Sequence, residues 1–241
     1  MAQLSSRVSV VIPVKDDEEL LERCLRALSL QTVPPHEIVV VDNGSETSPE
    51  ATASRWGARC IVESAPGIPA ASAAGFDAAR GRIIARLDAD SVPDSDWCAR
   101  VVDAFEADPA LVAITGPGVF PSLSPAMSRI IDVIYMRAYF SVFSRVIGRV
   151  PVFGSNFAMS ADAWRQARTA IHRDDPEVHD DLDLSFHLPR TGPVRFDPRL
   201  TVGISARPFA RPLAFLRRIW RGFRTVHVNR LHLRRGRLRP R

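Results

Sequence analysis

Two runs of β-branched residues, each followed by a helical pattern, place the strongest constraint on how this chain folds. Residues 8–14 (VSVVIPV) and 37–41 (EIVVV) are typical of strands buried on both faces. Between them, apolar residues recur at helical spacing through 20–28. The same alternation continues with strands expected at 59–62 and 82–87 and an Ala-rich helix expected at 70–80. Further along, Ser160 is expected to cap another helix, and a turn and a final strand are expected within 192–204. Alternating strands and helices with short connections predict an α/β fold, with a mainly parallel, twisted sheet flanked by helices.

The end of the first strand argues against one common function of such folds. The arrangement resembles a dinucleotide-binding fold, in which a Gly-x-Gly-x-x-Gly loop follows the first strand and holds a pyrophosphate. Here Pro13-Val14-Lys15 stands in that place. The sequence therefore disfavours binding of NAD.

Charge is divided unevenly along the 241 residues. The whole chain carries a formal charge of +5, but residues 205–241 contain 12 arginines and no Asp or Glu. Residues 1–204 are therefore acidic, with 20 basic and 27 acidic side chains. This pattern predicts a domain over residues 1–205, followed by an Arg-rich amphipathic extension over residues 206–241.

Cysteine content and hydropathy indicate the compartment. Cys24, Cys60 and Cys98 are odd in number and widely spaced, which fits neither a disulfide framework nor a zinc site. The sequence contains no uninterrupted run of 18 apolar residues that would span a bilayer. We also expect no signal peptide. A cytoplasmic location is expected.

Acidic residues stand at the ends of three expected elements. Asp42 follows the second strand, the Asp-x-Asp motif Asp88-Ala89-Asp90 follows the strand at 82–87, and Asp180-Asp181 precede a helical pattern. Taken singly, each is typical of a helix cap or a turn. Ligands of open α/β sheets bind outside the carboxyl ends of the strands, and Mg²⁺ is held by one or two carboxylates plus substrate phosphates. Together, the three groups indicate a metal–diphosphate site with a carboxylate base.

These motifs make the chain similar to the family 2 inverting glycosyltransferases, which have the Rossmann-like GT-A fold. The resemblance covers about residues 7–205 and implies a nucleotide-binding half (about 7–118) and a mixed acceptor half (about 119–205). It rests on four stretches in order, VIPVKD (11–16), EIVVVDNGS (37–45), GRIIARLDAD (81–90) and DDLDL (180–184). The implied reaction moves one sugar from a nucleotide-diphosphate sugar to an acceptor hydroxyl and inverts the anomeric configuration.

The resemblance also implies roles for individual residues. Contact with the nucleotide sugar is implied for Pro13, Val14, Asp16, Asp17, Asp42, Gly67, Asp88 and Ala89. Asp90, together with Asp88, would bind the divalent cation, Mg²⁺ or Mn²⁺, that bridges the diphosphate. Asp181 would be the catalytic base, and Asp180 would contact the acceptor beside it. Gly154 and Asn156 match a loop near the acceptor.

Two departures from the family pattern bear on the donor and the metal. Ser72-Ala73 stands where the family usually has Arg-Asn, which removes a contact to phosphate or sugar. After the final expected strand, residues 202–205 lack the His that often completes the metal site. The Gln-x-x-Arg-Trp pattern of processive polysaccharide synthases is absent as well, so transfer of a single sugar is favoured.

The Arg-rich extension has two interpretations. An amphipathic helix with arginines, Trp220 and Phe223 is what binding to an anionic membrane surface requires, and this would hold a cytoplasmic enzyme at the inner face of the membrane, near a lipid-linked or cell-envelope glycan acceptor. The same pattern is typical of a helix that packs its apolar stripe on the domain. Nucleic acid is not an expected partner, because the arginine content is the only feature of the sequence that would support such binding. Residues 127–147 form another amphipathic segment, for which packing is favoured over membrane contact.

Two other functions stay open at this point. A nucleotidyltransferase would also use paired aspartates with a metal, but it would be expected to carry a Gly-rich basic loop after the first strand. A catalytically silent module that binds nucleotide sugars would fit the two departures from the family pattern.

Overall fold

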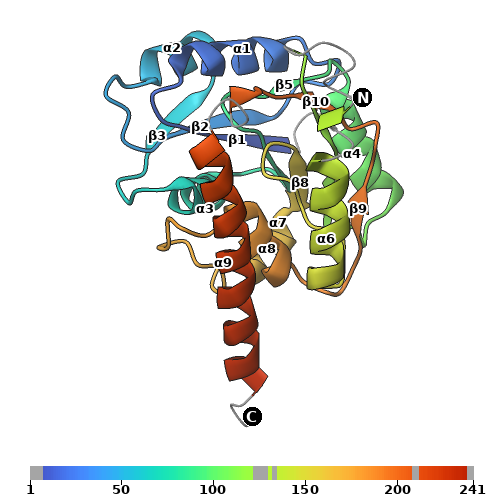
Figure 1. The fold of residues 1–241 in the computed structure, drawn as a ribbon. Coiled ribbons are helices and arrows are strands. Elements are labelled where there is room, and N and C mark those ends of the chain that lie inside the picture. The colour runs from blue at the N-terminus through green and yellow to red at the C-terminus, as the bar shows by residue number, and fades with distance from the viewer. Residues whose placement is uncertain (1–7, 122–129, 132–134, 208–211, 238–241) are drawn as a thin grey trace.

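A seven-stranded sheet forms the centre of the protein. The computed structural model describes residues 8–121, 130–131, 135–207 and 212–237. The strands lie in the order β3-β2-β1-β4-β8-β6-β9 (Figure 1). Their bounds are β1 Val8–Val14, β2 Glu37–Asp42, β3 Arg59–Val62, β4 Ile83–Arg86, β6 Ala113–Thr115, β8 Phe157–Ser160 and β9 Val194–Phe196.

The directions of these strands follow the predicted alternation. β1 is parallel to both β2 and β4, and β2 is parallel to β3. β8 lies between β4 and β6 and runs antiparallel to both, whereas β9 is parallel to β6. The prediction of a mainly parallel α/β sheet with a mixed C-terminal half is confirmed.

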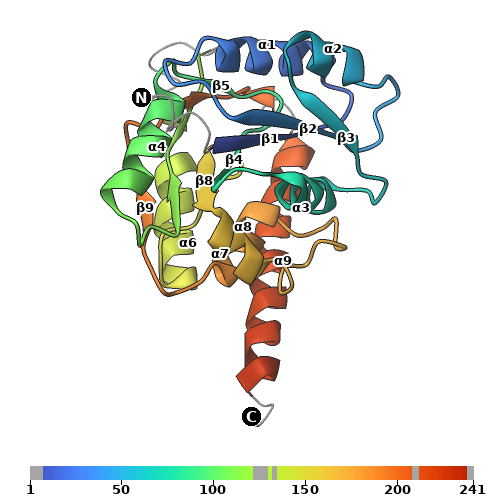
Figure 2. The ribbon, with the colours of Figure 1, turned by 180° about the vertical axis from the view of Figure 1, so that it is seen from behind.

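Helices cover both faces of the sheet, because its central strands are apolar on both faces. Val10 and Ile12 of β1 belong to the core formed with α1 and α4, whereas Val11 belongs to the core formed with α3. Neighbouring residues of a strand point to opposite faces, which explains the division. The helices of the first face are α1 (Glu18–Ser29), α2 (Glu50–Arg55) and α4 (Trp97–Ala107), and those of the second are α3 (Ile68–Ala78), α7 (Ala161–Ala167) and α8 (Asp180–His187), as Figure 2 shows from behind.

A small second sheet joins the end of the domain to the turn that follows β4. It consists of β5 (Val92–Pro93), β10 (Val202–Gly203) and β7 (Gly118–Val119), in the order β5-β10-β7. β10 is antiparallel to β5 and parallel to β7. β5 begins two residues after Asp90 and pairs with β10. This pairing brings the segment that follows β10 close to the Asp-x-Asp motif.

Some elements differ from their expected bounds. The Ala-rich helix expected at 70–80 begins at Ile68, because Pro69 lies in its first turn, where the missing N–H of proline costs nothing. The single strand expected within 192–204 is two strands of different sheets, β9 and β10. In the segment 127–147, α6 (Arg137–Ile147) forms the second half, and residues 127–129 and 132–134 lie outside the described ranges. Ser160 caps α7 as predicted, since its side chain accepts a hydrogen bond from the Ala163 amide.

The Arg-rich extension forms α9 (Pro212–Arg237), which packs on α8. Thr225 and Asn229 are fully buried at this contact. The Thr225 hydroxyl accepts from the His179 amide at 2.8 Å, and the Asn229 amide donates to Asp183 at 2.8 Å. The opposite side of α9 exposes Trp220, and the end of the helix extends beyond the body of the domain (Figure 1). None of the helices in the described ranges combines the length and the apolar character that crossing a bilayer requires.

Candidate active site

A cleft of about 950 Å³ opens where β1, β2 and β4 end. This is the edge at which open α/β sheets bind their ligands. Most of the predicted site residues line the cleft, namely Pro13, Val14, Asp16, Asp17, Gly67, Asp88, Ala89, Asp90, Gly154, Asp180 and Asp181.

Asp88 and Asp90 lie on a tight turn after β4. The Ser91 amide donates to the Asp88 carbonyl at 3.0 Å, and the Asp88 amide donates to the Ser91 hydroxyl at 3.2 Å. One oxygen of the Asp88 carboxylate accepts from Arg86 at 2.6 Å, and the other accepts from the Ser155 hydroxyl at 2.5 Å. Both oxygens of Asp88 therefore have protein partners, which leaves Asp90 as the better ligand for a cation.

Asp90 is a partly buried carboxylate in an acidic setting. Burial and the neighbouring Asp88 carboxylate raise the pKa of Asp90 to about 6, and Arg207 opposes this effect. The Arg207 guanidinium lies 3.8 Å from Asp90 and donates two hydrogen bonds to Asp17, at 2.7 and 3.0 Å. Arg207 was not predicted from the sequence. It follows the short strand β10, and a two-residue strand leaves no recognisable pattern in a sequence.

Two backbone features shape the ends of β1 and β2. Asp16 has a φ of 55°, a left-handed conformation that Asp tolerates, and its carboxylate accepts from the Glu46 amide at 2.7 Å. Gly67 has a φ of 115°, and a Cβ there would lie 2.9 Å from the Cβ of Pro176. Its amide donates to the Asn43 side chain at 2.8 Å. Glycine is therefore required at position 67 to form this wall of the cleft.

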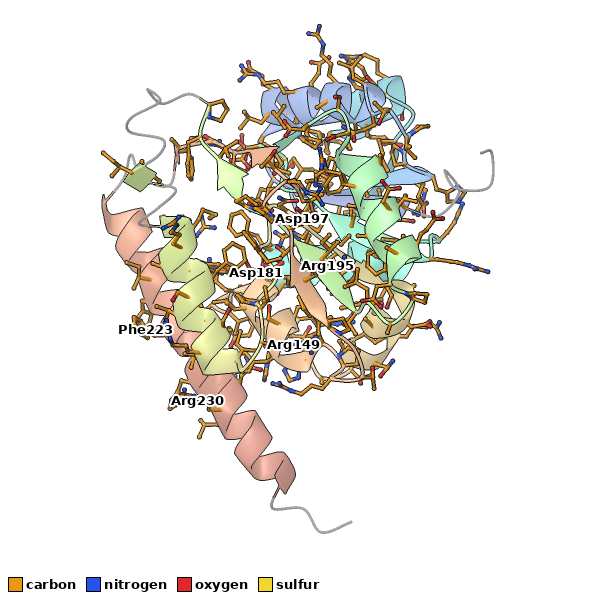
Figure 3. The ribbon with its side chains drawn as sticks, turned by 90° about the vertical axis from the view of Figure 1, so that its right-hand side faces the viewer. Arg149, Asp181, Arg195, Asp197, Phe223 and Arg230 are labelled. Atoms are coloured by element: carbon orange, nitrogen blue, oxygen red, sulfur yellow. The ribbon has the colours of Figure 1, made fainter. Side chains whose placement is uncertain are left out.

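On the opposite side, Asp181 in the first turn of α8 has a firmly oriented carboxylate. Oδ2 accepts from the Gly154 amide at 2.9 Å, and Oδ1 accepts from the Leu182 amide at 2.7 Å. Oδ2 also lies 3.2 Å from the Tyr139 hydroxyl, whose single proton it shares with the Val152 carbonyl at 2.8 Å. Burial, followed by the nearby Asp181 carboxylate, raises the pKa of Tyr139 well above its usual value, so this hydroxyl stays a donor. Figure 3 shows Asp181 in the interior, beside α6. The sequence offered no signal for Tyr139.

Arg86 connects the two sides of the cleft. Its guanidinium is 2% exposed and pairs with Asp88 at 2.6 Å and with Asp180 at 2.7 Å. Burial alone would lower the pKa of Arg86, but the Asp180 and Asp88 carboxylates outweigh it and raise that pKa. Burial raises the pKa of Asp180, while Arg86 opposes the shift, and the Ser72 hydroxyl donates to Asp180 at 2.9 Å. A Cβ on Gly154 would lie 2.6 Å from Arg86, so the loop must have glycine there.

Two of the predicted residues do not reach the cleft. Asn156 is fully buried, where its side chain accepts from Trp97 at 2.8 Å and donates to the carbonyl groups of Pro117 and Leu200 at 3.1 and 2.6 Å. The structure does not place this side chain in the cleft, because its hydrogen bonds hold the loop from within. Asp42 is also buried and accepts from an amide of the turn after β2 at 2.9 Å.

The side of the cleft next to α8 is closed by α9. Arg217, Arg218 and Arg221 line it, together with residues 176–179 of the loop before α8. Their clustering is visible in the sequence, but no local pattern tells that α9 returns to the cleft. This wall is the main part of the site that the sequence did not reveal.

A comparison of the sequence with known protein families agrees with this geometry. The model of glycosyl transferase family 2 matches residues 9–162, which is more than half of the chain. The chain belongs to glycosyl transferase family 2. The match includes the ends of β1, β2 and β4 with Asp88 and Asp90, and it stops before Asp180 and Asp181.

Curated relatives of this family 2 chain resemble part of it. Glycosyltransferase AglE of Haloferax volcanii is 35% identical over 106 residues, which cover 41% of this chain and 35% of the relative. An uncharacterized glycosyltransferase of Mycobacterium tuberculosis is 35% identical over 109 residues, which cover 45% of this chain and 47% of the relative. The matches thus span less than half the length of either relative.

Solved structures of glycosyltransferases share the fold. Mannosyltransferase PcManGT from Pyrobaculum calidifontis, solved with GDP-Man and Mn²⁺, superposes with a TM-score of 0.62 at 20% identity, covering 83% of this chain and 56% of that one. Glucosyl-3-phosphoglycerate synthase from Mycobacterium tuberculosis, solved with phosphoglyceric acid, superposes with a TM-score of 0.66 at 19% identity, covering 95% and 83%. The family 2 chain therefore has the GT-A fold, as predicted.

Proposed function

We propose that this chain transfers one sugar from a nucleotide-diphosphate sugar to an acceptor hydroxyl, with inversion of the anomeric configuration. One observation carries the proposal: a single cleft presents the Asp88–Asp90 turn on one side and the Asp181 carboxylate on the other. Sugar transfer needs a cation beside the leaving diphosphate and a positioned base at the acceptor oxygen. The Asp88–Asp90 turn would provide the first function, and Asp181 would provide the second.

The turn after β4 has the chemistry of a site for Mg²⁺ or Mn²⁺. Such ions prefer carboxylate oxygens, and Asp90, with Asp88, would hold the ion there. The raised pKa of Asp90 comes from burial and from Asp88, an effect that a bound cation reverses. When bound, the ion would neutralise charge on the diphosphate as it leaves. PcManGT, which shares the fold, was solved with GDP-Man and Mn²⁺.

The nucleotide would lie over the ends of β1 and β2. Pro13 and Val14 line the cleft there, and Asp16 and Asp17 follow them. Gly67 and Ala89 also line the cleft and would contact the nucleotide sugar. Arg207, which pairs with Asp17 and approaches Asp90, would supply positive charge next to the diphosphate.

Asp181 would act as the base. The acceptor oxygen attacks the anomeric carbon while the bond from that carbon to the diphosphate oxygen breaks, and Asp181 takes the proton of the hydroxyl. The carboxylate must lie within about 2.6–3.2 Å of the acceptor oxygen. The hydrogen bonds from Gly154 and Tyr139 orient it in advance, which supports this role. Asp180, paired with Arg86, lines the cleft beside it and would contact the acceptor.

A ligand screen tests the donor half of the proposal. UDP-, GDP- and dTDP-sugars are added with and without Mn²⁺, and thermal unfolding is followed, because a ligand that binds the folded state raises its stability. At about 100 times its Kd, the correct donor should add ~2.7 kcal/mol. Absence of stabilisation by every nucleotide sugar in the presence of Mn²⁺ would contradict the proposal.

Asp181→Asn then separates an enzyme from a silent binding module. In an enzyme, this variant keeps donor-dependent stabilisation and loses turnover by about 10²–10⁴-fold, the usual contribution of a general base. Asp103→Asn, at an exposed position of α4, is the matched control and should keep both. A binding module would show no turnover in any of these proteins.

We further propose that the outer side of α9 contacts an anionic membrane surface near a lipid-linked acceptor. Ile219, Trp220 and Phe223 are exposed by 43%, 54% and 70%. Phe223 and Arg230 project from the same outer side of the helix (Figure 3). Exposed apolar side chains combined with arginines are what an anionic membrane interface binds.

Flotation with vesicles of phosphatidylglycerol and phosphatidylcholine tests this contact. Because α9 forms a wall of the cleft, substitution is a cleaner test than removal of the helix. The double variant Trp220→Ser, Phe223→Ser should stay at the bottom of the gradient, while Val62→Ser, at a 74% exposed position of β3, should float like the native chain. Equal flotation of all three proteins would refute the contact.

A further inference from the structure

Three arginines of α9 line the wall of the cleft that leads to the candidate base. Arg217, Arg218 and Arg221 belong to this wall, together with the loop of residues 176–179. That loop runs directly into α8 and Asp181. The arginines therefore lie on the acceptor side of the proposed site.

Two of these arginines have protein partners that account for their positions in the structure. Arg217 pairs with Glu177 at 2.7 Å, and Arg221 approaches the same carboxylate at 4.0 Å. Arg221 also donates to the backbone carbonyl groups of Pro176 and Val178. These contacts fix the 176–179 loop against α9.

Arg218 differs from both of them. It is half-buried, and within the described ranges its guanidinium forms no ion pair or hydrogen bond. Burial would lower the pKa of Arg218, but Tyr135 and then Asp181 and Asp88 outweigh it and raise that pKa, so the side chain remains charged. A half-buried cation without a direct partner is costly unless a ligand supplies the missing anion.

The charge of this wall points to the same conclusion. Its three guanidinium groups share one carboxylate, that of Glu177, which leaves an excess of positive charge beside Asp181. Arg207 lies 3.8 Å from Asp90 and would meet the diphosphate of the donor, while Arg218 also acts on Asp90 but less strongly than Arg207 does. A neutral sugar acceptor would not use a free guanidinium. A phosphate monoester, with a charge of about −1.5 to −2 at pH 7, would pair with this guanidinium.

We propose that the acceptor carries a phosphate group, which Arg218 binds while the acceptor hydroxyl faces Asp181. The inference rests on the proposed sugar transfer and names the acceptor class for the same cleft. Guanidinium groups bind phosphate through paired, charge-assisted hydrogen bonds, so one well-placed arginine orients the acceptor as well as attracting it. The phosphate belongs either to a water-soluble ester or to the head of a lipid.

Calorimetric titration of the full chain tests this assignment. The protein is first saturated with Mn²⁺ and the nucleoside diphosphate found in the donor screen, so that the diphosphate site is filled. Glycerol 1-phosphate then represents a soluble phosphate ester, and decyl phosphate in detergent represents a lipid phosphate. Glycerol and decanol are the uncharged controls. The variants are Arg218→Gln and, as a matched control at an exposed position of α1 away from both the cleft and α9, Arg23→Gln.

We expect at least one phosphate probe to bind and both uncharged controls to fail. Arg218→Gln should weaken that binding by roughly tenfold or more, as expected when a hydrogen bond to a charged group is lost, and Arg23→Gln should not. Binding of the soluble probe supports a site for phosphate alone, and binding of decyl phosphate alone supports a phosphate on an apolar chain.

Other outcomes overturn the inference. It fails if neither phosphate probe binds the native chain, or if Arg218→Gln binds the probes as tightly as the native chain does. It also fails if Arg218→Gln weakens the nucleoside diphosphate instead, because Arg218 would then serve the donor. If no nucleotide binds at all, the proposed function fails, and titration of glycerol 1-phosphate with Mn²⁺ alone still reports on Arg218.

Discussion

The two sides of the cleft are built in different ways. The side at β1, β2 and β4 consists of short segments that directly follow strands, so each side chain is positioned within a few residues of its strand. The other side combines Tyr139 of α6, Asp181 of α8 and Arg218 of α9, which tertiary packing brings together. Local sequence encodes the first side, whereas the second exists only once the helices have packed.

The largest effect is expected at Arg86, which belongs to both sides. Arg86→Met leaves the carboxylates of Asp88 and Asp180 without their buried cation. Removal of one partner of a buried ion pair costs about 3–5 kcal/mol. Urea unfolding at neutral pH should show this loss in the free energy of unfolding.

A matched substitution at an exposed pair provides the control. Arg55→Met breaks an ion pair with Glu22 on the surface, which should cost at most ~1 kcal/mol. If Arg86→Met were as mild as Arg55→Met, the two sides of the cleft would not depend on Arg86 for their connection.

The next effect separates the donor side from the acceptor side. Asp90→Ala should remove the Mn²⁺-dependent part of donor binding, so that most of the ~2.7 kcal/mol of stabilisation expected at about 100 times Kd disappears. The chain should stay folded, since Asp90 is a partly buried carboxylate with a raised pKa and its loss relieves repulsion with Asp88. Binding of glycerol 1-phosphate at Arg218 should be retained. An Asp90→Ala protein that bound Mn²⁺ and donor normally would show that the cation lies elsewhere.

The smallest effect concerns how α9 is anchored, and it depends on pH. Asp183 of α8 bonds to His172 Nδ1 and to the Asn229 amide of α9, each at 2.8 Å. The hydrogen bond with Asp183 raises the pKa of His172. Burial alone would raise the pKa of Asp183, but hydrogen bonds from His172 outweigh it and lower that pKa.

These directions fix the pH range in which the pair stabilises the fold. The contribution of His172 is complete below its unfolded pKa of about 6.5 and is lost as pH rises through its higher folded value. The contribution of Asp183 is complete above about 3.9 and is lost as pH falls through its lower folded value. His172→Asn should therefore cost roughly 1–2 kcal/mol near pH 5.5 and less near pH 9, measured by urea unfolding.

His187 is the control for this prediction, because its Nε2 lies 3.7 Å from the same Asp183 carboxylate. His187→Asn should preserve the pH dependence that His172→Asn removes. An equal loss from His172→Asn at both pH values would show that the His172 proton has no part in anchoring α8 and α9.

Much of the fold was predictable, because its signals are local. The β-branched runs at β1 and β2 and the helical spacing of α1 predict the parallel core directly. The short strands β5, β7 and β10 were not predicted, because two residues carry no periodicity and pairing with distant partners alone defines them. The split of the last expected strand into β9 and β10 has the same cause.

The same division holds for the site. Asp88, Asp90 and Asp181 line the cleft as expected. Each of them lies at the end of a strand or a helix, and in this fold those ends lie along the same edge of the sheet. Asn156 lies outside the cleft, and the sequence cannot tell that Trp97 and two carbonyl groups use its amide. Arg218 was counted as part of a basic tail, since nothing local distinguishes an arginine that enters a cleft from one in solvent.

Arg86 finally limits how this chain can be divided and recombined. A fragment ending near residue 118 would keep Arg86 with Asp88 but lose Asp180, and it would also uncover the edge of β4 that pairs with β8. Exposed strand edges are templates for pairing with other chains. Residues up to about 118 are therefore not an exchangeable module. A hybrid enzyme that keeps only this part must bring both a strand for β4 and an acid that reaches Arg86.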